Sequence, residues 1–283
     1  MKTYLDCIPC FFRQALFAAR LVLDDENEIK HVLDRIGMLL PEILPHSSPP
    51  ETGRKIYKTV REVSGVEDPF KALKEQSIVK ALQLYPGLRL AVQQASDPLE
   101  MAARVAIAGN VIDFGANPDF ELERDILAAL EVEPVINHYA IFAKKVAAAK
   151  MILYLGDNAG ETVFDKILIE TMGKPVVYAV RGAPVINDAT LEDAQRSNLD
   201  DVADLLSSEC DAPGFLLDCC SEEFVDHFMK ADLIISKGQG NWECLSDERR
   251  PIFYLLKAKC PVISRELGVA TGNTVIKYAL GGG

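Results

Sequence analysis

Apolar residues in the first half of the chain recur at the three- and four-residue spacing of amphipathic helices. This spacing predicts helices over residues 11–23, 29–44, 78–95 and 99–112. Proline-rich breaks separate these segments, and Ser96-Asp97-Pro98 has residues that commonly begin a helix. Few β-branched runs occur before residue 145, so we expect residues 1–145 to form a helical domain.

The pattern changes near residue 145 to short, continuous apolar runs that alternate with amphipathic stretches. The runs predict strands over residues 151–155, 176–180, 231–235 and 261–263. The stretches between them predict helices over residues 161–172, 199–206, 222–229 and 242–256. Continuous apolarity is typical of strands buried on both faces, and strand–helix alternation indicates a mostly parallel sheet. We therefore expect residues 146–283 to form an α/β domain, which makes the fold class α/β plus all-α.

Polar segments follow three of the predicted strands at the points where the strands end. They are Gly156-Asp157-Asn158-Ala159-Gly160-Glu161, the stretch from Arg181 to Asp188, and Ser236-Lys237-Gly238-Gln239-Gly240-Asn241. The carboxyl ends of parallel strands meet at one edge of a sheet, where ligands commonly bind. We therefore expect these polar side chains to converge: Asp157, Asn158, Arg181, Asp188 and Lys237.

The converging residue types favour a divalent metal beside a phosphate. Two carboxylates and an amide oxygen, from Asp157, Asp188 and Asn158, are the hard ligands that Mg²⁺ or Mn²⁺ prefers. Lys237 lies in a glycine-containing loop whose backbone N–H groups can approach an anion closely. Taken singly, Asp157 also fits a helix N-cap, Asp188 a loop-to-helix junction and Lys237 a solvated lysine. Their occurrence at successive strand ends favours the metal and phosphate interpretation.

Composition narrows the range of partners. The chain has 283 residues with 42 acidic against 30 basic side chains, a net charge of −12 that disfavours nucleic acid. No apolar run approaches membrane-spanning length, and the amino terminus lacks the apolar stretch of a signal peptide. Seven cysteines, mostly in apolar contexts, favour reduced thiols over a disulfide framework. We expect a cytoplasmic protein that binds neither nucleic acid nor membrane.

Several motifs resemble those of the damage-control phosphatase family, also known as domain of unknown function 89. They are Asp157-Asn158-Ala159-Gly160-Glu161, Asn187-Asp188-Ala189-Thr190 and Lys237-Gly238-Gln239-Gly240-Asn241. The resemblance extends to residues 108–115 and 256–263, so it covers nearly the whole chain in the family's order. The amino-terminal Cys7-Ile8-Pro9-Cys10 is similar to the prokaryotic branch of the family.

This resemblance implies a helical domain packed on a Rossmann-like domain, and a metal-dependent phosphatase of small phosphorylated metabolites such as sugar phosphates. It implies that Asp157, Asn158 and Asp188 bind the metal, which would be Mg²⁺, Mn²⁺, Co²⁺ or Ni²⁺, and that Lys237 contacts the substrate phosphate. The predicted substrate-binding residues are Asn110, Asp113, Glu161, Arg181, Lys237, Gly238 and Asn241. From the sequence alone, residues 110–113 fit equally well as a helix end closed by Gly115.

The expected mechanism uses a metal-activated water for in-line attack on phosphorus, with Lys237 and loop amides neutralising the phosphate oxygens. Covalent attack by Asp157 is the alternative, but position 159 is Ala, so the Asp-x-Asp arrangement of aspartyl-phosphate enzymes is absent. Cys7 and Cys10 have the spacing of metal ligands and suggest a second metal site, but no second cysteine pair at such spacing accompanies them, and buried helix cysteines are the simpler interpretation.

Two other functions compete with a phosphatase. Residues 155–160 form a glycine-containing strand-to-helix turn, which is also typical of S-adenosylmethionine-dependent methyltransferases. Such enzymes commonly carry an acid at the end of the next strand to hold a ribose, and here that position is Arg181, which favours an anion. A non-catalytic phospho-ligand binding protein would keep Lys237 and the glycine loop but would have no use for the metal.

Overall fold

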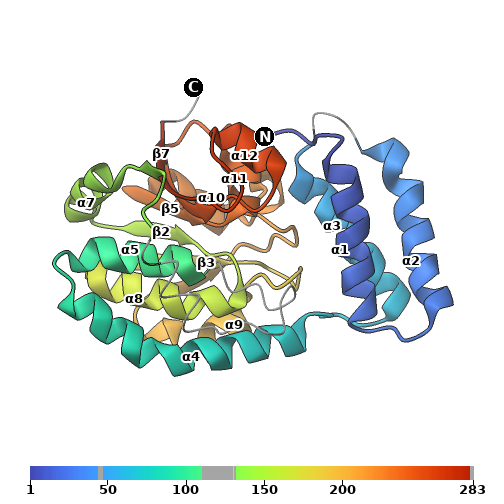
Figure 1. Cartoon of the computed structure of the whole chain (residues 1–283), viewed down its shortest axis with the longest axis horizontal. Helices are drawn as coiled ribbons and strands as arrows, with labels where there is room; N and C mark the ends of the chain where they lie inside the picture. The colour runs from blue at the N-terminus through green and yellow to red at the C-terminus, as the bar shows by residue number, and fades with distance from the viewer. Residues whose placement is uncertain (44–46, 110–129, 131, 281–283) are drawn as a thin grey trace.

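A mostly parallel sheet lies at the centre of the larger part of the molecule (Figure 1). The computed structural model describes residues 1–43, 47–109, 130 and 132–280. Within them, the strands form a seven-stranded sheet in the order β1-β7-β6-β5-β2-β3-β4, and only the pair β6 and β7 is antiparallel. The strands are β1 Ile136–Asn137, β2 Ile152–Leu155, β3 Val176–Val180, β4 Asp204–Ser207, β5 Leu233–Lys237, β6 Ile252–Lys257 and β7 Thr274–Ala279.

Helices cover both faces of this sheet and form a separate bundle at one end (Figure 1). The bundle contains α1 Cys7–Arg20, α2 Glu26–Leu39 and α3 Pro49–Ser64. The other α-helices are α4 Lys71–Gln94, α5 Pro98–Ala108, α7 Tyr139–Ala148, α8 Thr162–Met172, α9 Leu191–Arg196, α10 Glu222–Lys230, α11 Gln239–Leu245 and α12 Pro261–Leu267. Short 3₁₀ turns lie at η1 Leu40–Glu42, η3 Ala159–Glu161, η4 Leu199–Asp201 and η5 Leu217–Cys219.

Alternate residues of the central strands enter two different hydrophobic cores, because successive side chains of a strand point to opposite faces. In β2, Leu153 and Leu155 join the core that contains α10, α11, α12 and the bundle. Ile152 and Tyr154 of the same strand join the core that contains α4, α5, α7 and α8. Both faces are therefore buried, which explains the continuous apolar runs in the sequence and confirms the α/β fold class with a mostly parallel sheet.

The helices of the first 145 residues pack in two places. The bundle helices α1, α2 and α3 pack on one another, whereas α4 and α5 pack along α8 on one face of the sheet (Figure 1). Small residues in α5, such as Ala102, Ala103 and Ala106, are fully buried in that contact. The predicted division at residue 145 thus groups α4 and α5 with a bundle that they do not join. Helical periodicity indicates that a helix has a buried face, but it does not identify the partner.

Three predicted elements are wrong. The run expected as a strand at 261–263 begins α12, because Pro261 occupies the first turn of that helix after the extended residue Cys260. The helix expected over 242–256 ends at Leu245, and Pro251 precedes strand β6. The helix expected over 199–206 is a 3₁₀ turn followed by β4.

The remaining expected strands and helices are present, with bounds shifted by a few residues. The last part of the predicted helix 99–112 lies outside the described residues. No helix in the described part of the chain is both long and apolar enough to cross a membrane.

The burial of β6 can be tested at Phe253, which is fully buried between Phe142 and Tyr278, with ring centroids at 5.3 and 4.5 Å. Replacing Phe253 with Ala should lower the free energy of unfolding by about 3–5 kcal/mol, because it leaves a large cavity. Urea denaturation measures this change. The control Val79→Ala alters an exposed residue of α4 and should change stability by less than about 0.5 kcal/mol. An equally small effect of Phe253→Ala would contradict this packing.

Candidate active site

The segments that follow β2 and β3 lie side by side at the carboxyl edge of the sheet. Asn158 and Asp188 pair as an isolated antiparallel bridge. The Ala189 N–H donates to the Asp157 carbonyl at 2.8 Å, and the Ala159 N–H donates to the Asn187 carbonyl at 2.8 Å. Backbone hydrogen bonds thus hold the two predicted metal-binding segments in a fixed register. The structure brings together Asp157, Asn158 and Asp188, as the sequence pattern indicates.

Three carboxylates are buried around the Asn158 side chain. Asp157 is 8% exposed, Asp188 4% and Glu161 1%. The Asn158 amide nitrogen donates to Asp157 Oδ2 at 3.2 Å and also to Glu161 Oε1. Burial raises the pKa of Asp157 well above its usual range, and the negative charges of Glu161 and Asp188 raise it further. This pocket of carboxylates would be stabilised by additional positive charge.

Gly238 permits this arrangement. It follows β5 with a φ of +77°, and a Cβ at this position would lie 1.9 Å from Asp157 Oδ2. Any side chain here would therefore displace the carboxylate as well as strain the backbone. The glycine contributes space to the site, and its predicted contact with a substrate stays a prediction.

Arg181 and Asn241 form a buried hydrogen-bond network that includes the Asp188 carboxylate. Arg181 is 1% exposed and donates from Nε to Asp188 Oδ2 at 2.6 Å and from Nη2 to Asn241 Oδ1 at 2.9 Å. Its guanidinium lies 4.2 Å from the centroid of the Phe215 ring. Asn241 in turn donates to the carbonyls of Gly156 and Lys237 at 3.0 and 2.8 Å. Both predicted substrate-binding side chains are thus engaged with the protein itself.

Lys237 does not have the position that its predicted phosphate contact requires. Its side chain is fully buried, and Nζ lies 2.6 Å from Asp165 Oδ1 and 3.0 Å from Glu161 Oε2. Asp165 also accepts hydrogen bonds from Tyr154 and Tyr178 at 2.7 and 2.8 Å. Burial lowers the pKa of Lys237, but the charges of Asp165 and Glu161 outweigh this effect, so its pKa is raised and the ammonium stays charged.

The direction of the Lys237 side chain follows from its place in β5. Leu233, Ile235 and Lys237 alternate along the strand and share the face that α8 covers, where Asp165 lies. The correction to the expected role is therefore that Lys237 holds Glu161, which in turn accepts a hydrogen bond from Asn158.

Lys259 is a cation at the site that the sequence interpretation missed. It is exposed, it lies just beyond the end of β6, and its charge lowers the pKa of both Asp157 and Asp188. Its N–H donates to Gln239 Oε1 at 3.1 Å, which ties this loop to α11. Prediction of strand β6 would have identified this lysine, because a strand ending at Lys257 places Lys259 at the same sheet edge as the other motifs.

The oxygen donors at this edge fit a hard divalent cation. Asp157 and Asp188 supply carboxylates, and rotation of the Asn158 amide by half a turn would present its oxygen in place of its nitrogen. No three His, Cys, Asp or Glu side chains in the described ranges are arranged to hold a metal. The Asn158 amide would supply a third oxygen beside the two carboxylates. The metal itself stays a prediction.

Four further predicted residues are Asn110, Asp113, Cys7 and Cys10. Asn110 and Asp113 lie outside the described residues. Cys7 is buried and Cys10 half-buried in the first turn of α1, where Gln14 Nε2 lies 3.4 Å from Cys10 Sγ. The second metal site at these cysteines stays a prediction.

A cavity of about 1000 Å³ opens beside the site rather than at it, between α3 and residues 211–219. Arg54, Arg61 and Glu243 are among its lining residues, and none of the predicted site residues lines it. Arg61 Nη1 donates to the Pro184 carbonyl at 2.8 Å, so the cavity adjoins the loop between Arg181 and Asp188.

Comparison with known proteins identifies the family. The sequence model of the damage-control phosphatase ARMT1-like domain matches residues 3–275. The chain belongs to this family. A damage-control phosphatase of Archaeoglobus fulgidus is 35% identical over 98% of this chain and 99% of its own length. An uncharacterized protein of Methanocaldococcus jannaschii is 36% identical over 98% of this chain and 95% of its own length.

A solved structure of the family has the same fold. The crystal structure of a DUF89 family protein from Pyrococcus horikoshii superposes with a TM-score of 0.91. The two sequences are 33% identical, and the match covers 98% of this chain and 99% of that one. The family resemblance read from the motifs is therefore confirmed, together with the fold that it implies.

The position of Lys237 predicts a large loss of stability on substitution. Lys237→Met leaves the buried Asp165 and Glu161 carboxylates without their ammonium partner, so the free energy of unfolding should fall by about 3–5 kcal/mol. Chemical denaturation without any ligand measures the change. Lys259→Met, at the exposed lysine of the same edge, should change stability by less than about 0.5 kcal/mol. Equal and small effects of both variants would show that Lys237 is not enclosed.

Proposed function

We propose that this protein is a divalent-metal-dependent phosphatase that hydrolyses small phosphorylated metabolites. The observation that carries the proposal is the buried group of Asp157, Asn158 and Asp188 at the carboxyl edge of the sheet, with exposed Lys259 near it. The name "damage-control phosphatase" of two relatives, 34% and 35% identical over nearly the full chain, supports the same activity.

The three oxygen-bearing side chains would hold the metal, and the metal would supply Lewis-acid polarisation of the phosphate and a more acidic water. Arg181 orients Asp188 through a 2.6 Å hydrogen bond; burial raises the pKa of Asp188, and the charge of Arg181 opposes that rise. Lys237 orients Glu161, which accepts a hydrogen bond from Asn158, through a 3.0 Å hydrogen bond. These two buried cations therefore act on the ligands rather than on the substrate, which leaves Lys259 to neutralise charge on the phosphate.

Close packing around Asp157, together with the absence of an Asp-x-Asp arrangement, favours a metal ligand over a nucleophile. Oδ1 lies 3.8 Å from Arg181 Nη2, and Oδ2 lies 3.2 Å from the Asn158 amide nitrogen. Gly238 is also close enough to Asp157 to restrict movement of its carboxylate. Attack by water on the phosphorus is therefore the step we infer: the bond between phosphorus and the bridging ester oxygen breaks, the alcohol leaves with a proton from the water, and inorganic phosphate is released.

Phosphate release from a panel of sugar phosphates and p-nitrophenyl phosphate tests the metal requirement. EDTA should abolish release, and Mg²⁺, Mn²⁺, Co²⁺ or Ni²⁺ added singly should identify the ions that restore it. Asp157→Asn and Asp188→Asn should each lower it more than about 100-fold, since losing a direct ligand costs more than losing its supporting partner. Release that is indifferent to EDTA and to Asp188→Asn would refute the metal site. Phosphate binding without release would indicate a binding protein instead.

Substitution of Lys259 distinguishes an effect on substrate binding from an effect on metal binding. Lys259→Met should raise KM about 10-fold, the effect expected on loss of a charged hydrogen bond to an anion, while metal activation stays unchanged. The matched control is Lys150→Met, at an exposed lysine near the opposite, amino-terminal end of β2. Unchanged KM in Lys259→Met would remove this lysine from the proposed site.

A further inference from the structure

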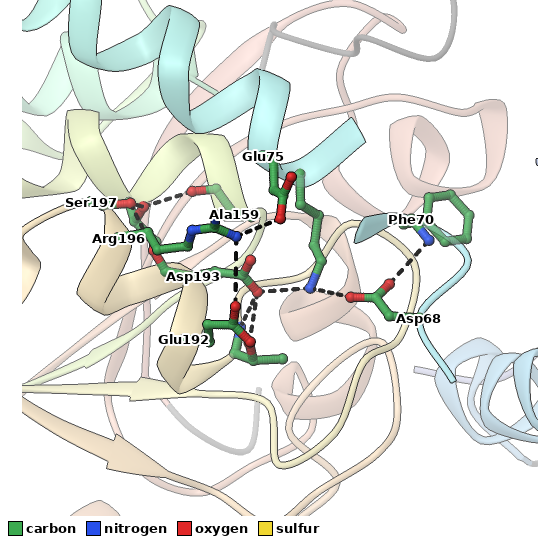
Figure 2. Close-up of polar contacts among 11 residues, drawn as sticks. Asp68, Phe70, Glu75, Ala159, Glu192, Asp193, Arg196 and Ser197 are labelled. Atoms are coloured by element: carbon green, nitrogen blue, oxygen red, sulfur yellow. Dashed lines mark hydrogen bonds and ion pairs between the residues drawn. The ribbon is translucent and has the colours of Figure 1, made fainter. Parts of the chain in front are cut away.

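A buried ammonium joins the bundle, the sheet domain and the Asp188 segment. In Figure 2, dashed lines from Asp68 and Asp193 meet at one nitrogen, which is Nζ of Lys74 in α4. The distances are 2.7 Å to Asp68 Oδ2 and 2.8 Å to Asp193 Oδ2. The Lys74 side chain is 3% exposed, so these ion pairs are shielded from solvent. Nothing in the sequence pattern singled out this lysine.

The ion pair between Lys74 and Asp193 connects to the candidate site. Asp193 Oδ2, which pairs with Lys74, also accepts hydrogen bonds from Thr190 N at 2.9 Å and Thr190 Oγ1 at 2.7 Å. Thr190 is the N-cap of α9 and lies two residues beyond Asp188. Between them, Ala189 bonds to the backbone of both Asp157 and Arg181. The carboxylate of Asp193 thus positions the end of the segment that carries Asp188.

The ion pair between Lys74 and Asp68 connects to the bundle. Asp68 lies in the connection between α3 and α4, and its Oδ1 accepts the Phe70 N–H at 3.0 Å. The Phe70 ring packs edge-on against Tyr57 of α3, with ring centroids 6.1 Å apart. Burial raises the pKa of Tyr57 and the charge of Asp188 raises it further, so the bundle approaches the site at this residue. Lys74 therefore connects to both sides of the candidate site.

Helix α9 has other attachments that do not involve Lys74. Arg196 Nη1 bonds Glu75 Oε1 of α4 at 2.6 Å, and Ser197 bonds Thr162 of α8 (Figure 2). A change at Lys74 should therefore leave α9 in place and alter only the fine position of Thr190 and the connection at Asp68.

We propose that Lys74 is a positioning residue that sets the Asp188 segment and the three-helix bundle relative to each other. This rests on the proposed function, in which Asp188 binds the metal. A buried ion triad is a costly way to join helices, because apolar residues of the same volume commonly stabilise as well or better. The Lys74 ammonium instead fixes the distances between the three backbone segments that carry Asp68, Lys74 and Asp193. Lys74 therefore governs the affinity of the site for metal and substrate, more than the rate of the chemical step.

The experiment compares Lys74→Met, Lys74→Arg and Lys166→Met with the unchanged full-length protein. Lys166 is a matched control, because it is also a nearly buried lysine that joins two elements, through Asp201 at 2.8 Å and the Asn198 carbonyl. Lys74→Met should weaken Mn²⁺ binding, measured by calorimetry without substrate, and raise KM, each by about 10–100-fold, as for other supporting partners of metal ligands. The value of kcat should change much less. Lys74→Arg should restore most of both values.

Lys166→Met should lose stability without loss of Mn²⁺ affinity. Unaltered Mn²⁺ affinity and KM in folded Lys74→Met would overturn the proposal, as would equal effects of the two methionine variants. If Lys74→Met does not fold, Asp68→Asn tests the ion pair between Lys74 and the connection to the bundle. This variant should raise KM in the same way. An unchanged KM in Asp68→Asn would also overturn the proposal.

A failure of the proposed function can be recognised separately. If the unchanged protein binds no Mn²⁺, the metal site is wrong, and amide hydrogen exchange then tests the positioning role alone. The amides of Ala189 and Thr190 should exchange faster in Lys74→Met than in Lys166→Met at matched stability. Equal exchange rates would overturn the proposal.

Discussion

Buried ion pairs beneath the carboxyl edge of the sheet are the constraint on which the candidate site depends. Among the described residues there, Asp157, Glu161, Asp165 and Asp188 are buried together with two cations, Arg181 and Lys237. Each cation bonds directly to at least one of these carboxylates. The surplus of negative charge raises the energy of the site when no further cation is present. That surplus favours a divalent metal, and the rigid backbone pairing of Asn158 with Asp188 determines where it would bind.

The rest of the fold keeps these charges in place. Two helical layers exclude water from both sheet faces, so Lys237 and Asp165 interact without solvent screening. Tyr154 and Tyr178 complete the hydrogen bonding of Asp165, which avoids an unsatisfied buried carboxylate. The same solution, a lysine shared between two carboxylates, occurs again at Lys74. At both places a buried lysine joins separate elements of the fold.

The convergence of the site was predictable from the sequence, because parallel strands end at one edge and each of three strands is followed by polar residues. The directions in which these side chains point were harder to predict than their convergence at one edge. Period-two alternation within β5 would have placed Lys237 on the α8 side, but the glycine-containing loop after it favoured a phosphate contact. Lys259 was missed because residues 252–256, most of β6, were included in the helix predicted over 242–256. Asp165 resembles any polar residue of an amphipathic helix, and only the packing of α8 against β5 reveals its partner.

The place of β7 within the sheet bears on how the protein forms during synthesis. Residues 274–279 lie between β6 and β1, so the last of the described strands along the sequence is an interior strand of the sheet. β1 pairs only with β7 among the described strands, and the paired residues Ile136 and Val275 lie 139 positions apart in the sequence. The five strands β2, β3, β4, β5 and β6 can associate earlier, but among the described strands β1 has no partner until β7 has been synthesised. Pairing across such a sequence separation is slow, so completion of the sheet is expected to be the late step in folding.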